Sequence, residues 1–348
     1  MKKWMLGYIR CGVAVLLYPL ALIAQDGVLS VPAKEVPLPT TVSPQLRNLI
    51  GQPVPPIASI PKNADEWREL QRNEDAEAAK ISQAAAAFVG AEVEATKVGG
   101  VSCFRVTPKE VAAENKNRLI VHVHGGAFVF NGGVAGTGEA VLLADACKTP
   151  SLSIDYRMPP DHPFPAAADD VLAVWKAVAA EHDPDKTAMA GTSAGGGLIL
   201  TTMLRLKGTD VPRPAALFIG TPGADLSKTG DSVYLNAEVD NMLGRYEGRM
   251  EACVKLYAAG RDLKEPLISP LYGDLSGCPP TILVSGTRDL LLSATVRTHR
   301  KLRGAGIVAD LHVYEGMSHA MYLTSFPSPE SRDALGEIAM FFDRYLKR

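Results

Sequence analysis

The sequence predicts an α/β fold built on a mostly parallel, doubly wound sheet. From about residue 119 onward, short apolar runs that can form buried strands alternate with longer segments whose apolar residues recur at helical spacing. This alternation is typical of a parallel sheet with helices on both faces. The chain has 348 residues, of which 47% are hydrophobic and 21% charged, and this is ample for one large core with a smaller cap.

The first residues differ in kind from the rest of the chain. Lys2, Lys3 and Arg10 precede an apolar run at residues 11–24, whose length suits the hydrophobic region of a secretory signal and is short for a membrane-spanning helix. We therefore expect residues 1–24 to be a signal peptide and the mature protein to be secreted or periplasmic. An uncleaved membrane anchor is the alternative.

Two further segments precede the first strands. Residues 25–61 are rich in Pro, Val and Ser, and we expect an extended lead-in there. Asn63 or Asp65 can then cap a helix that runs to Phe88 and is free to cover a site on the sheet. Residues 25–90 are thus assigned to a Pro-rich lead-in and N-terminal cap helices.

The main domain is expected at residues 91–225 and 266–348. It opens with an antiparallel hairpin over residues 93–106 that turns at two consecutive glycines. The further strands are expected at residues 119–123, 151–154, 215–219, 281–284 and 311–314, and the helices at 137–147, at 166–181 and from Pro329 onward.

Residues 221–280 break the alternation of strands and helices. They are too many for an ordinary connection, and they contain a helical pattern at residues 248–259. A segment of this length must carry structure of its own, and it leaves the sheet at the edge where the carboxyl ends of the strands lie. We expect residues 226–265 to form a cap insertion over the functional site.

The stretch GTSAG at residues 191–195 joins an apolar strand to an apolar helix. Gly191 and Gly195 allow the close approach of strand and helix that a sharp turn requires, and such a turn holds the Ser193 hydroxyl clear of the backbone. This pattern indicates a nucleophile elbow. By itself it is equally typical of a glycine-rich helix start, so the residues that would activate the serine must also be present.

Two later residues can activate Ser193. A serine hydroxyl is a weak nucleophile at neutral pH, so it needs a histidine to take its proton and a carboxylate to orient that histidine. Asp289 and His319 follow in the chain order Ser, Asp, His, each in a loop just beyond the carboxyl end of a predicted strand. We predict the catalytic triad Ser193, Asp289 and His319. Asp225, which also follows a strand, is the main alternative to Asp289.

The remaining candidates are expected to be structural. His122 alternates with apolar residues in a predicted strand, His299 lies within a helical segment, and His312 lies inside another strand. Asp155 follows a strand ahead of the elbow, and we expect it to be a buried loop anchor for Arg157.

A glycine-rich turn after the central strand can supply backbone donors. The tetrahedral intermediate of acyl transfer carries a negative oxygen that needs N–H groups already in place. The segment HGGA at residues 124–127 stands where such a turn is needed. We predict an oxyanion hole made by the N–H groups of Gly125, Gly126 and Ala194, with His124 as an organiser of the loop.

Charge and cysteine content exclude several other classes. The net charge of −2 and the lack of a basic run do not suggest nucleic acid or an anionic membrane surface as a partner. The cysteines after the apolar run are widely spaced in a chain large enough to fold without disulfides, so we expect mostly free, buried thiols. No Cys-x-x-Cys or His-x-x-x-His pair occurs, so we expect neither a metal nor a cofactor.

Four motifs, in this order along the chain, resemble those of the bacterial hormone-sensitive-lipase-like esterases, which have the α/β-hydrolase fold. They are HGGA at residues 124–127, DYRMPPDHPFPA at 155–166, GTSAGG at 191–196 and SPL at 269–271. With Thr192 before the serine, the GTSAGG motif resembles the branch of the family that has Thr, not Asp, before the nucleophile. The chain departs from the usual pattern at Ala127, where a third glycine is common, and at Leu290, where proline is common after the acid.

The resemblance implies a serine carboxylic-ester hydrolase that prefers short acyl chains, works through an acyl-enzyme and has a helical cap. It implies that Ser193, Asp289 and His319 form the triad, and that backbone N–H groups hold the oxyanion. The partner would be a small-molecule ester, with a membrane involved only if the N-terminal segment stays uncleaved. An amide or peptide hydrolase with the same triad and a non-catalytic ligand-binding protein are the alternatives. The oligomeric state stays open, a homodimer included.

Overall fold

The computed structural model describes residues 27, 32–33, 35–54, 56 and 59–348. The predicted signal peptide lies outside these residues. The chain divides into two units, Met1–Pro37 and Leu38–Arg348, and the fold described below is that of the second. In the described part of the chain, no helix is long and apolar enough to cross a membrane.

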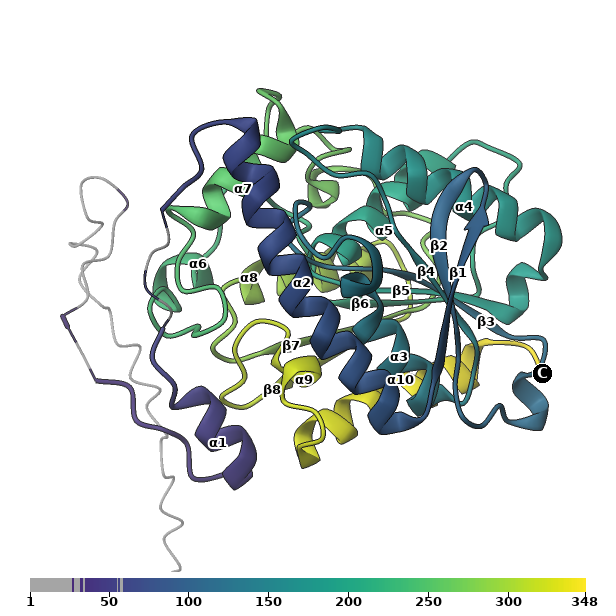
Figure 1. The fold of residues 1–348 in the computed structure, drawn as a ribbon, viewed down its shortest axis with the longest axis horizontal. Helices are drawn as coiled ribbons and strands as arrows, with labels where there is room; N and C mark the ends of the chain where they lie inside the picture. The colour runs from purple at the N-terminus through teal and green to yellow at the C-terminus, as the bar shows by residue number, and fades with distance from the viewer. Residues whose placement is uncertain (1–26, 28–31, 34, 55, 57–58) are drawn as a thin grey trace, which may run out of the picture. The chain divides into compact units, whose positions relative to one another are not determined.

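A single eight-stranded sheet forms the centre of this unit, with strand order β1-β2-β4-β3-β5-β6-β7-β8 (Figure 1). The strands are β1 (Glu92–Val98), β2 (Val101–Thr107), β3 (Leu119–Val123), β4 (Ser151–Ile154), β5 (Thr187–Thr192), β6 (Ala216–Gly220), β7 (Thr281–Gly286) and β8 (Ala309–Tyr314). The β1–β2 and β2–β4 pairs are antiparallel, and all pairs from β4 to β8 are parallel. The predicted mostly parallel sheet and its opening hairpin are confirmed.

Helices cover both faces of the sheet, with α4 and α5 on one face and α3 and α10 on the other (Figure 1). The helices are α1 (Pro44–Ile50), α2 (Ala64–Val89), α3 (Gly138–Cys147), α4 (Ala166–Glu181), α5 (Ala194–Leu206), α6 (Ser232–Leu235), α7 (Arg249–Ala258), α8 (Leu292–Gly304), α9 (Met321–Thr324) and α10 (Pro329–Tyr345). Every residue of β5, β6 and β7 is buried. These strands therefore read as continuous apolar runs, not as alternating patterns.

Each face of the sheet carries its own core. On one face, Trp175 of α4 and Leu198 of α5 pack against the sheet in the larger cluster. On the other face, Leu143 of α3 and Ile338 of α10 belong to a second cluster. Four cysteines, Cys103, Cys147, Cys253 and Cys278, are free thiols with buried side chains, in line with the expectation from their spacing.

The lead-in is not extended throughout, and the prediction for residues 25–61 is wrong at α1. Ser43 caps this helix, its Oγ accepting the N–H of Leu46 at 3.1 Å, and Pro44 occupies the first helical position. Proline suits that position because its fixed φ is already helical and its missing N–H would have no partner there. Leu46 and Ile50, one turn apart, are buried. A Pro-rich composition favours an extended chain, whereas Pro44 begins a helix here.

Helices α2, α6 and α7 lie outside the sheet-covering layers. Asn63 caps α2, its Oδ1 accepting the N–H of Glu66 at 3.0 Å, and the helix crosses the front of the view in Figure 1. Helices α6 and α7 belong to the predicted cap insertion. Trp67 of α2, Cys253 of α7 and Phe130 of the loop after β3 form one small apolar cluster. The N-terminal and inserted segments therefore meet over that loop.

Candidate active site

Ser193 lies on the tight turn between β5 and α5. Its backbone has φ 58° and ψ −120°, a conformation that residues with a side chain rarely adopt. A Cβ added at Gly191 or at Gly195 would overlap the carbonyl oxygen of Val123 in the neighbouring strand β3. The two glycines therefore permit this close packing, and the geometry matches the predicted elbow.

His319 and Asp289 form a buried pair at the carboxyl ends of β7 and β8. The Nδ1 of His319 lies 3.1 Å from Oδ1 of Asp289, and Asp289 has no exposed surface. The other carboxylate oxygen accepts the hydroxyls of Thr221 and Ser285, the latter at 2.8 Å. The N–H of Leu291 donates to Oδ1 at 2.8 Å. With these donors the buried carboxylate is held in one orientation.

The charges of this pair shift both of its pKa values. Burial raises the pKa of Asp289, but the charge and hydrogen bond of His319, with the Thr221 hydroxyl, lower it further, so the net pKa is below its ordinary value. Burial lowers the pKa of His319, but Asp289 and then Asp240 raise it more, so its net pKa lies above its ordinary value. Because Nδ1 faces a carboxylate, neutral His319 carries its proton on Nδ1 and leaves Nε2 as an acceptor.

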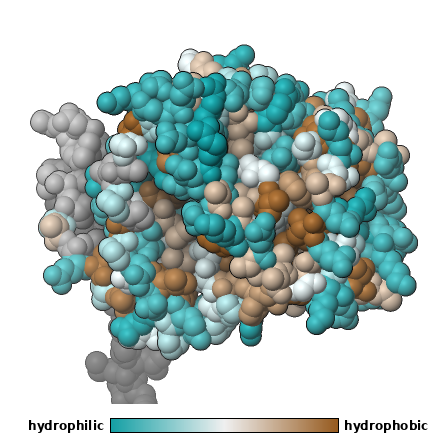
Figure 2. Space-filling view, viewed as in Figure 1, coloured by the Kyte–Doolittle hydropathy of each residue, from teal (hydrophilic) through white to brown (hydrophobic). Residues whose placement is uncertain are grey.

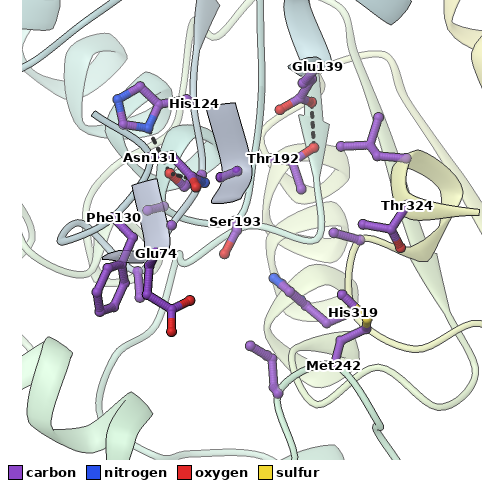
Figure 3. Close-up of a pocket in the computed structure, with 18 of the residues that line it drawn as sticks. Glu74, His124, Phe130, Asn131, Glu139, Thr192, Ser193, Met242, His319 and Thr324 are labelled. Carbon is purple, nitrogen blue, oxygen red and sulfur yellow. Dashed lines mark hydrogen bonds between the residues drawn. The ribbon is translucent and has the colours of Figure 1, made fainter. Parts of the chain in front are cut away.

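Ser193 and His319 line the same cavity, and Figure 3 shows the histidine ring and the serine hydroxyl facing one another. The cavity has a volume of about 910 Å³ and is lined mainly by apolar side chains. No hydrogen bond joins Ser193 to His319 in the described part of the chain. Bonds of this kind are often long before substrate binds, so the arrangement is compatible with proton transfer between the two side chains.

The predicted oxyanion donors, Gly125, Gly126 and Ala194, line this cavity beside Ser193. Among the residues that the structure describes, their N–H groups donate to no protein acceptor. Gly126 has φ 109°, and a Cβ there would overlap the carbonyl oxygen of Phe130. Ala127, which replaces a third glycine, nevertheless has φ 52°, so the loop keeps a left-handed backbone at that position.

His124 organises the oxyanion loop, as the sequence indicates. Its ring stacks on Tyr156 with centroids 4.0 Å apart, and its Nδ1 lies 2.7 Å from the carbonyl oxygen of Gly125. Burial lowers the pKa of His124 to about 3, so the ring is neutral at physiological pH. A neutral ring with this contact donates from Nδ1 to Gly125, and it cannot also accept a proton there as a base.

A buried polar network that no sequence pattern predicts lies behind Ser193. Thr192 Oγ1 donates to Glu139 Oε1 at 2.5 Å and lies 2.7 Å from the hydroxyl of Tyr322 (Figure 3 shows the Glu139 bond). His122 Nε2 lies 3.1 Å from the other oxygen of Glu139. The residue before Ser193 is thereby tied to α3 and α9. Nothing in the spacing of these four residues signals that they meet.

The alternatives to the predicted triad have other partners. The carboxylate of Asp225 pairs with Arg297 at 2.5 Å, away from His319. His122 belongs to the network behind Thr192, His299 lies 3.2 Å from the carbonyl of Ala309, and His312 lies on β8. None of these side chains lines the cavity.

Asp155 does not anchor Arg157, and that prediction is wrong. Its carboxylate accepts the N–H of Gly133 at 2.8 Å, whereas Arg157 pairs with Asp170 of α4 at 2.7 Å. The contact between Arg157 and α4 joins residues that lie further apart in the chain, and proximity in sequence favoured the nearer acid.

The donor set of the site suits proton transfer and anion stabilisation. In the described part of the chain, no group of three or more His, Cys, Asp and Glu side chains could hold a metal ion. A serine at an elbow, a histidine held by a buried carboxylate and neighbouring free N–H groups can together perform acyl transfer.

Comparisons with known proteins point to the same chemistry. Residues 120–323 match a family model described as alpha/beta hydrolase fold. An esterase of Acinetobacter venetianus is 31% identical over 68% of this chain and 78% of its own length. An acetyl-hydrolase of Streptomyces hygroscopicus is 30% identical over 67% of this chain and 77% of its own length.

Two solved structures are similar over most of the chain. The crystal structure of an esterase called E25 is 46% identical, with a TM-score of 0.89, and the match covers 92% of this chain and 99% of that one. The crystal structure of an esterase from the bacterial hormone-sensitive lipase family is 27% identical, with a TM-score of 0.74, and the match covers 88% and 99% of the two chains.

Proposed function

The chain belongs to the α/β-hydrolase family, in its bacterial hormone-sensitive-lipase-like branch, and we propose that it hydrolyses carboxylic esters through an acyl-enzyme intermediate. The observation that carries this proposal is the buried His319–Asp289 pair, with Nδ1 and Oδ1 3.1 Å apart, in the same cavity as Ser193 on its elbow. The name esterase, which several of the relatives carry, supports ester over amide substrates.

Acylation begins with attack of Ser193 on the ester carbonyl. His319 Nε2 takes the proton of the hydroxyl as the C–O bond forms, and Asp289 stabilises the resulting imidazolium. The N–H groups of Gly125, Gly126 and Ala194 hold the negative oxygen of the tetrahedral intermediate. His319 then returns the proton to the departing alcohol, and the acyl group stays on the serine.

Deacylation repeats these steps with water as the nucleophile. His319 Nε2 takes a proton from a water molecule that attacks the acyl carbonyl, and the same N–H groups hold the second oxyanion. The proton then passes to the oxygen of Ser193, which releases the carboxylic acid. Since Asp289 orients the imidazole in both halves, loss of its charge impairs both.

We propose a substrate with a short acyl chain and an apolar alcohol group. The acetyl-hydrolase among the relatives supports the preference for short acyl chains. The cavity of about 910 Å³ exceeds what an acetyl group needs, and Ile81, Phe88 and Leu323 give it apolar walls. Figure 2 shows apolar residues among polar ones on the face that α2 crosses. The remaining volume would take the alcohol part.

The proposal is tested with p-nitrophenyl esters from acetate to laurate. We expect turnover that is highest for short chains, that falls roughly 10⁶-fold in Ser193→Ala and that falls roughly 10⁴-fold in Asp289→Asn. Asp225→Asn is the matched control, because it removes a buried carboxylate paired with Arg297 and away from the cavity, and its turnover should be unchanged.

Two results would favour the other readings of the site. Hydrolysis of anilides without hydrolysis of esters would indicate an amide hydrolase. A folded protein that cleaves no ester of any chain length, yet binds one, would indicate a ligand-binding protein. Wild-type turnover in Asp289→Asn would remove Asp289 from the triad.

We also propose that the protein is exported and acts in the periplasm or outside the cell. The motivation is the basic start followed by the apolar run at residues 11–24. The mass of the protein purified from its native host should correspond to a chain that begins near Gln25. A mass that includes residues 1–24, found in the membrane fraction, would instead indicate an uncleaved anchor, and one found in the soluble fraction would contradict export.

A further inference from the structure

A second buried carboxylate lies beside the triad and comes from the cap insertion. Asp240, in the segment between α6 and α7, has no exposed surface. A buried charge is unfavourable unless hydrogen bonds or an opposite charge compensate it. Among the residues that the structure describes, no Lys or Arg side chain pairs with Asp240, so its hydrogen bonds must account for its burial.

Four backbone N–H groups surround this carboxylate. Oδ1 accepts those of Met242 at 2.9 Å, Leu243 at 3.1 Å and His319 at 3.3 Å. Oδ2 accepts that of Leu290 at 2.8 Å. Since all four partners are donors, Asp240 fits this environment as a carboxylate.

Two of these donors belong to the two loops that carry the triad. Leu290 directly follows Asp289, and the third donor to Oδ1 is the backbone N–H of His319 itself. One side chain therefore connects the loop after β7 to the loop after β8. The separation between Asp289 and His319 depends on the relative position of these loops. By bonding to both loops, Asp240 constrains that separation.

Asp240 also acts on His319 through its charge. Burial and then the nearby Asp289 raise the pKa of Asp240, while His319 and the N–H groups of Leu290 and Leu243 lower it, and the net pKa lies above its ordinary value. Asp289 and then Asp240 are the groups that raise the pKa of His319 against the effect of burial. An imidazolium at His319 is thus near two carboxylates, Asp289 in the loop after β7 and Asp240 in the insertion.

The next residue fastens the same segment to the catalytic loop. The N–H of Asn241 donates to Ser318 Oγ at 3.2 Å, and Ser318 Oγ donates to Asn241 Oδ1 at 2.7 Å. The side-chain nitrogen Nδ2 of Asn241 donates to the carbonyl oxygen of Leu49 in α1 at 2.7 Å. These bonds connect the segment that carries Asp240 to the loop of His319 and to α1.

We propose that Asp240 is a positioning residue for the triad, which fixes His319 against Asp289 and stabilises the imidazolium that forms during acyl transfer. This role rests on the proposed esterase function, and it makes the cap insertion part of the catalytic apparatus as well as a cover. Asp240 does not line the cavity, so it acts through His319 and the loop of Asp289 and not on the substrate directly.

The test compares Asp240→Asn and Asp240→Glu with the wild type. We expect kcat of Asp240→Asn on a short p-nitrophenyl ester to fall roughly 10-fold to 100-fold with little change in KM, because transition-state stabilisation is lost and binding is not. The acid limb of its kcat/KM profile should move to lower pH, since His319 loses a charge that favours its protonated form. Asp240→Glu, which keeps the charge, should restore the position of the limb.

Two controls separate this role from general destabilisation. Asp225→Asn removes another buried carboxylate and should leave the acid limb in place. Asn241→Ala breaks the link to Ser318 but keeps the charge of Asp240, so it should lower kcat without moving the limb. If Asp240→Asn moves the limb no more than Asp225→Asn does, the electrostatic role is wrong.

A direct readout does not depend on ester turnover. The imidazole of His319 can be titrated by NMR, through its ring nitrogens and the Nδ1 proton shared with Asp289, in Ser193→Ala with and without Asp240→Asn. We expect the pKa of His319 to be lower without the Asp240 charge. An unchanged pKa of His319 in the folded double variant overturns the proposal, even if the wild-type enzyme cleaves esters. A lowered pKa of His319, combined with a wild-type protein that cleaves no ester, supports the role of Asp240 and refutes the proposed substrate.

Discussion

Ser193 keeps its unfavourable backbone conformation because its neighbours bind it on both sides. Its N–H donates to the carbonyl of Gly220 at 2.9 Å, and its carbonyl accepts the N–H groups of Gly197 at 3.1 Å and Gly223 at 2.8 Å. A positive φ at a residue with a side chain costs of order 1–3 kcal/mol and persists only where the surroundings fix it. Here the end of β6 and the first turn of α5 provide those bonds.

Gly195 should tolerate no side chain. A Cβ there would overlap the carbonyl carbon and oxygen of Val123 in the neighbouring strand, and neither can move without disturbing the sheet. We expect Gly195→Ala to lower the free energy of unfolding by roughly 3 kcal/mol and to reduce kcat by misplacing Ser193. Chemical denaturation and the p-nitrophenyl ester assay measure the two effects.

Gly336 is the matched control for this substitution. It lies inside α10, where a Cβ would have no neighbour within 4 Å. Alanine is a better helix former than glycine, so Gly336→Ala should raise the free energy of unfolding by up to about 1 kcal/mol and leave kcat unchanged. Equal stability of the two variants would contradict the close packing inferred at Gly195.

Thr221 shows what a single residue contributes without any sequence signal. Its hydroxyl donates to Asp289, although the two are far apart in the chain, and its backbone has φ 30°. Threonine after a strand is common, and no motif marks this one. Its role follows only from the parallel pairing of β6 with β7, which puts the ends of the two strands side by side.

Helix α1 supports the loop that carries His319. Ile50 packs against Gly316 in that loop, where its Cδ1 would lie 3.0 Å from an added Cβ. At the other end of α1, the N–H and Oγ of Ser43 donate to the two carboxylate oxygens of Glu330 at 2.5 and 2.7 Å. The start of α10 thereby holds the N-terminal helix in place.

The bond between α1 and α10 should make stability depend on pH. Burial raises the pKa of Glu330, but the donors of Ser43 lower it, so the net pKa lies below the ordinary 4.5. A lowered pKa in the folded state gives stability that is present above about pH 4.5 and is lost as the pH falls through the folded pKa. We expect Glu330→Gln to reduce the free energy of unfolding by roughly 1 kcal/mol at pH 7.

Thermal unfolding of Glu330→Gln and the wild type at several pH values measures this dependence. The difference in stability between the two proteins should shrink as the pH is lowered below 4.5, because Glu330 then loses its charge and becomes neutral like Gln. Glu337→Gln, on the same helix and without a hydrogen bond to α1 in the described residues, is the control. A difference that stays constant from pH 7 to pH 4 would show that the charge of Glu330 contributes nothing.

Three parts of the chain that are distant in sequence meet at the loops of Asp289 and His319. The loops after β7 and β8 carry Asp289 and His319, the cap insertion carries Asp240, and α1 is bonded to that insertion through Asn241. Deletions or insertions in the cap segment should therefore affect the triad as well as substrate access. This arrangement explains why a surface segment can carry a fully buried acid.

Periodic patterns predicted the strands of the sheet and the long helices that cover it. The strands at residues 119–123 and 151–154 and the helix at 166–181 have the predicted bounds, because buried parallel strands and amphipathic helices leave local signals. Other strand ends differ by one or two residues, since the exact end depends on pairing. Helix α1 leaves no such signal, because its apolar stripe of Leu46 and Ile50 is only one turn long.

The sequence by itself predicted the order of elements and the sharp turn at Ser193, and it led to the proposal of His319 and Asp289 as partners of that serine. These follow from local periodicity, from glycine at positions without room for a side chain, and from chain order. Only the tertiary structure decided which polar groups meet behind them: Glu139 with Thr192, Thr221 with Asp289, and Asp240 with both triad loops. The physical reason is that hydrogen bonds between distant segments depend on how strands pair and pack, and no local pattern of residues encodes that pairing.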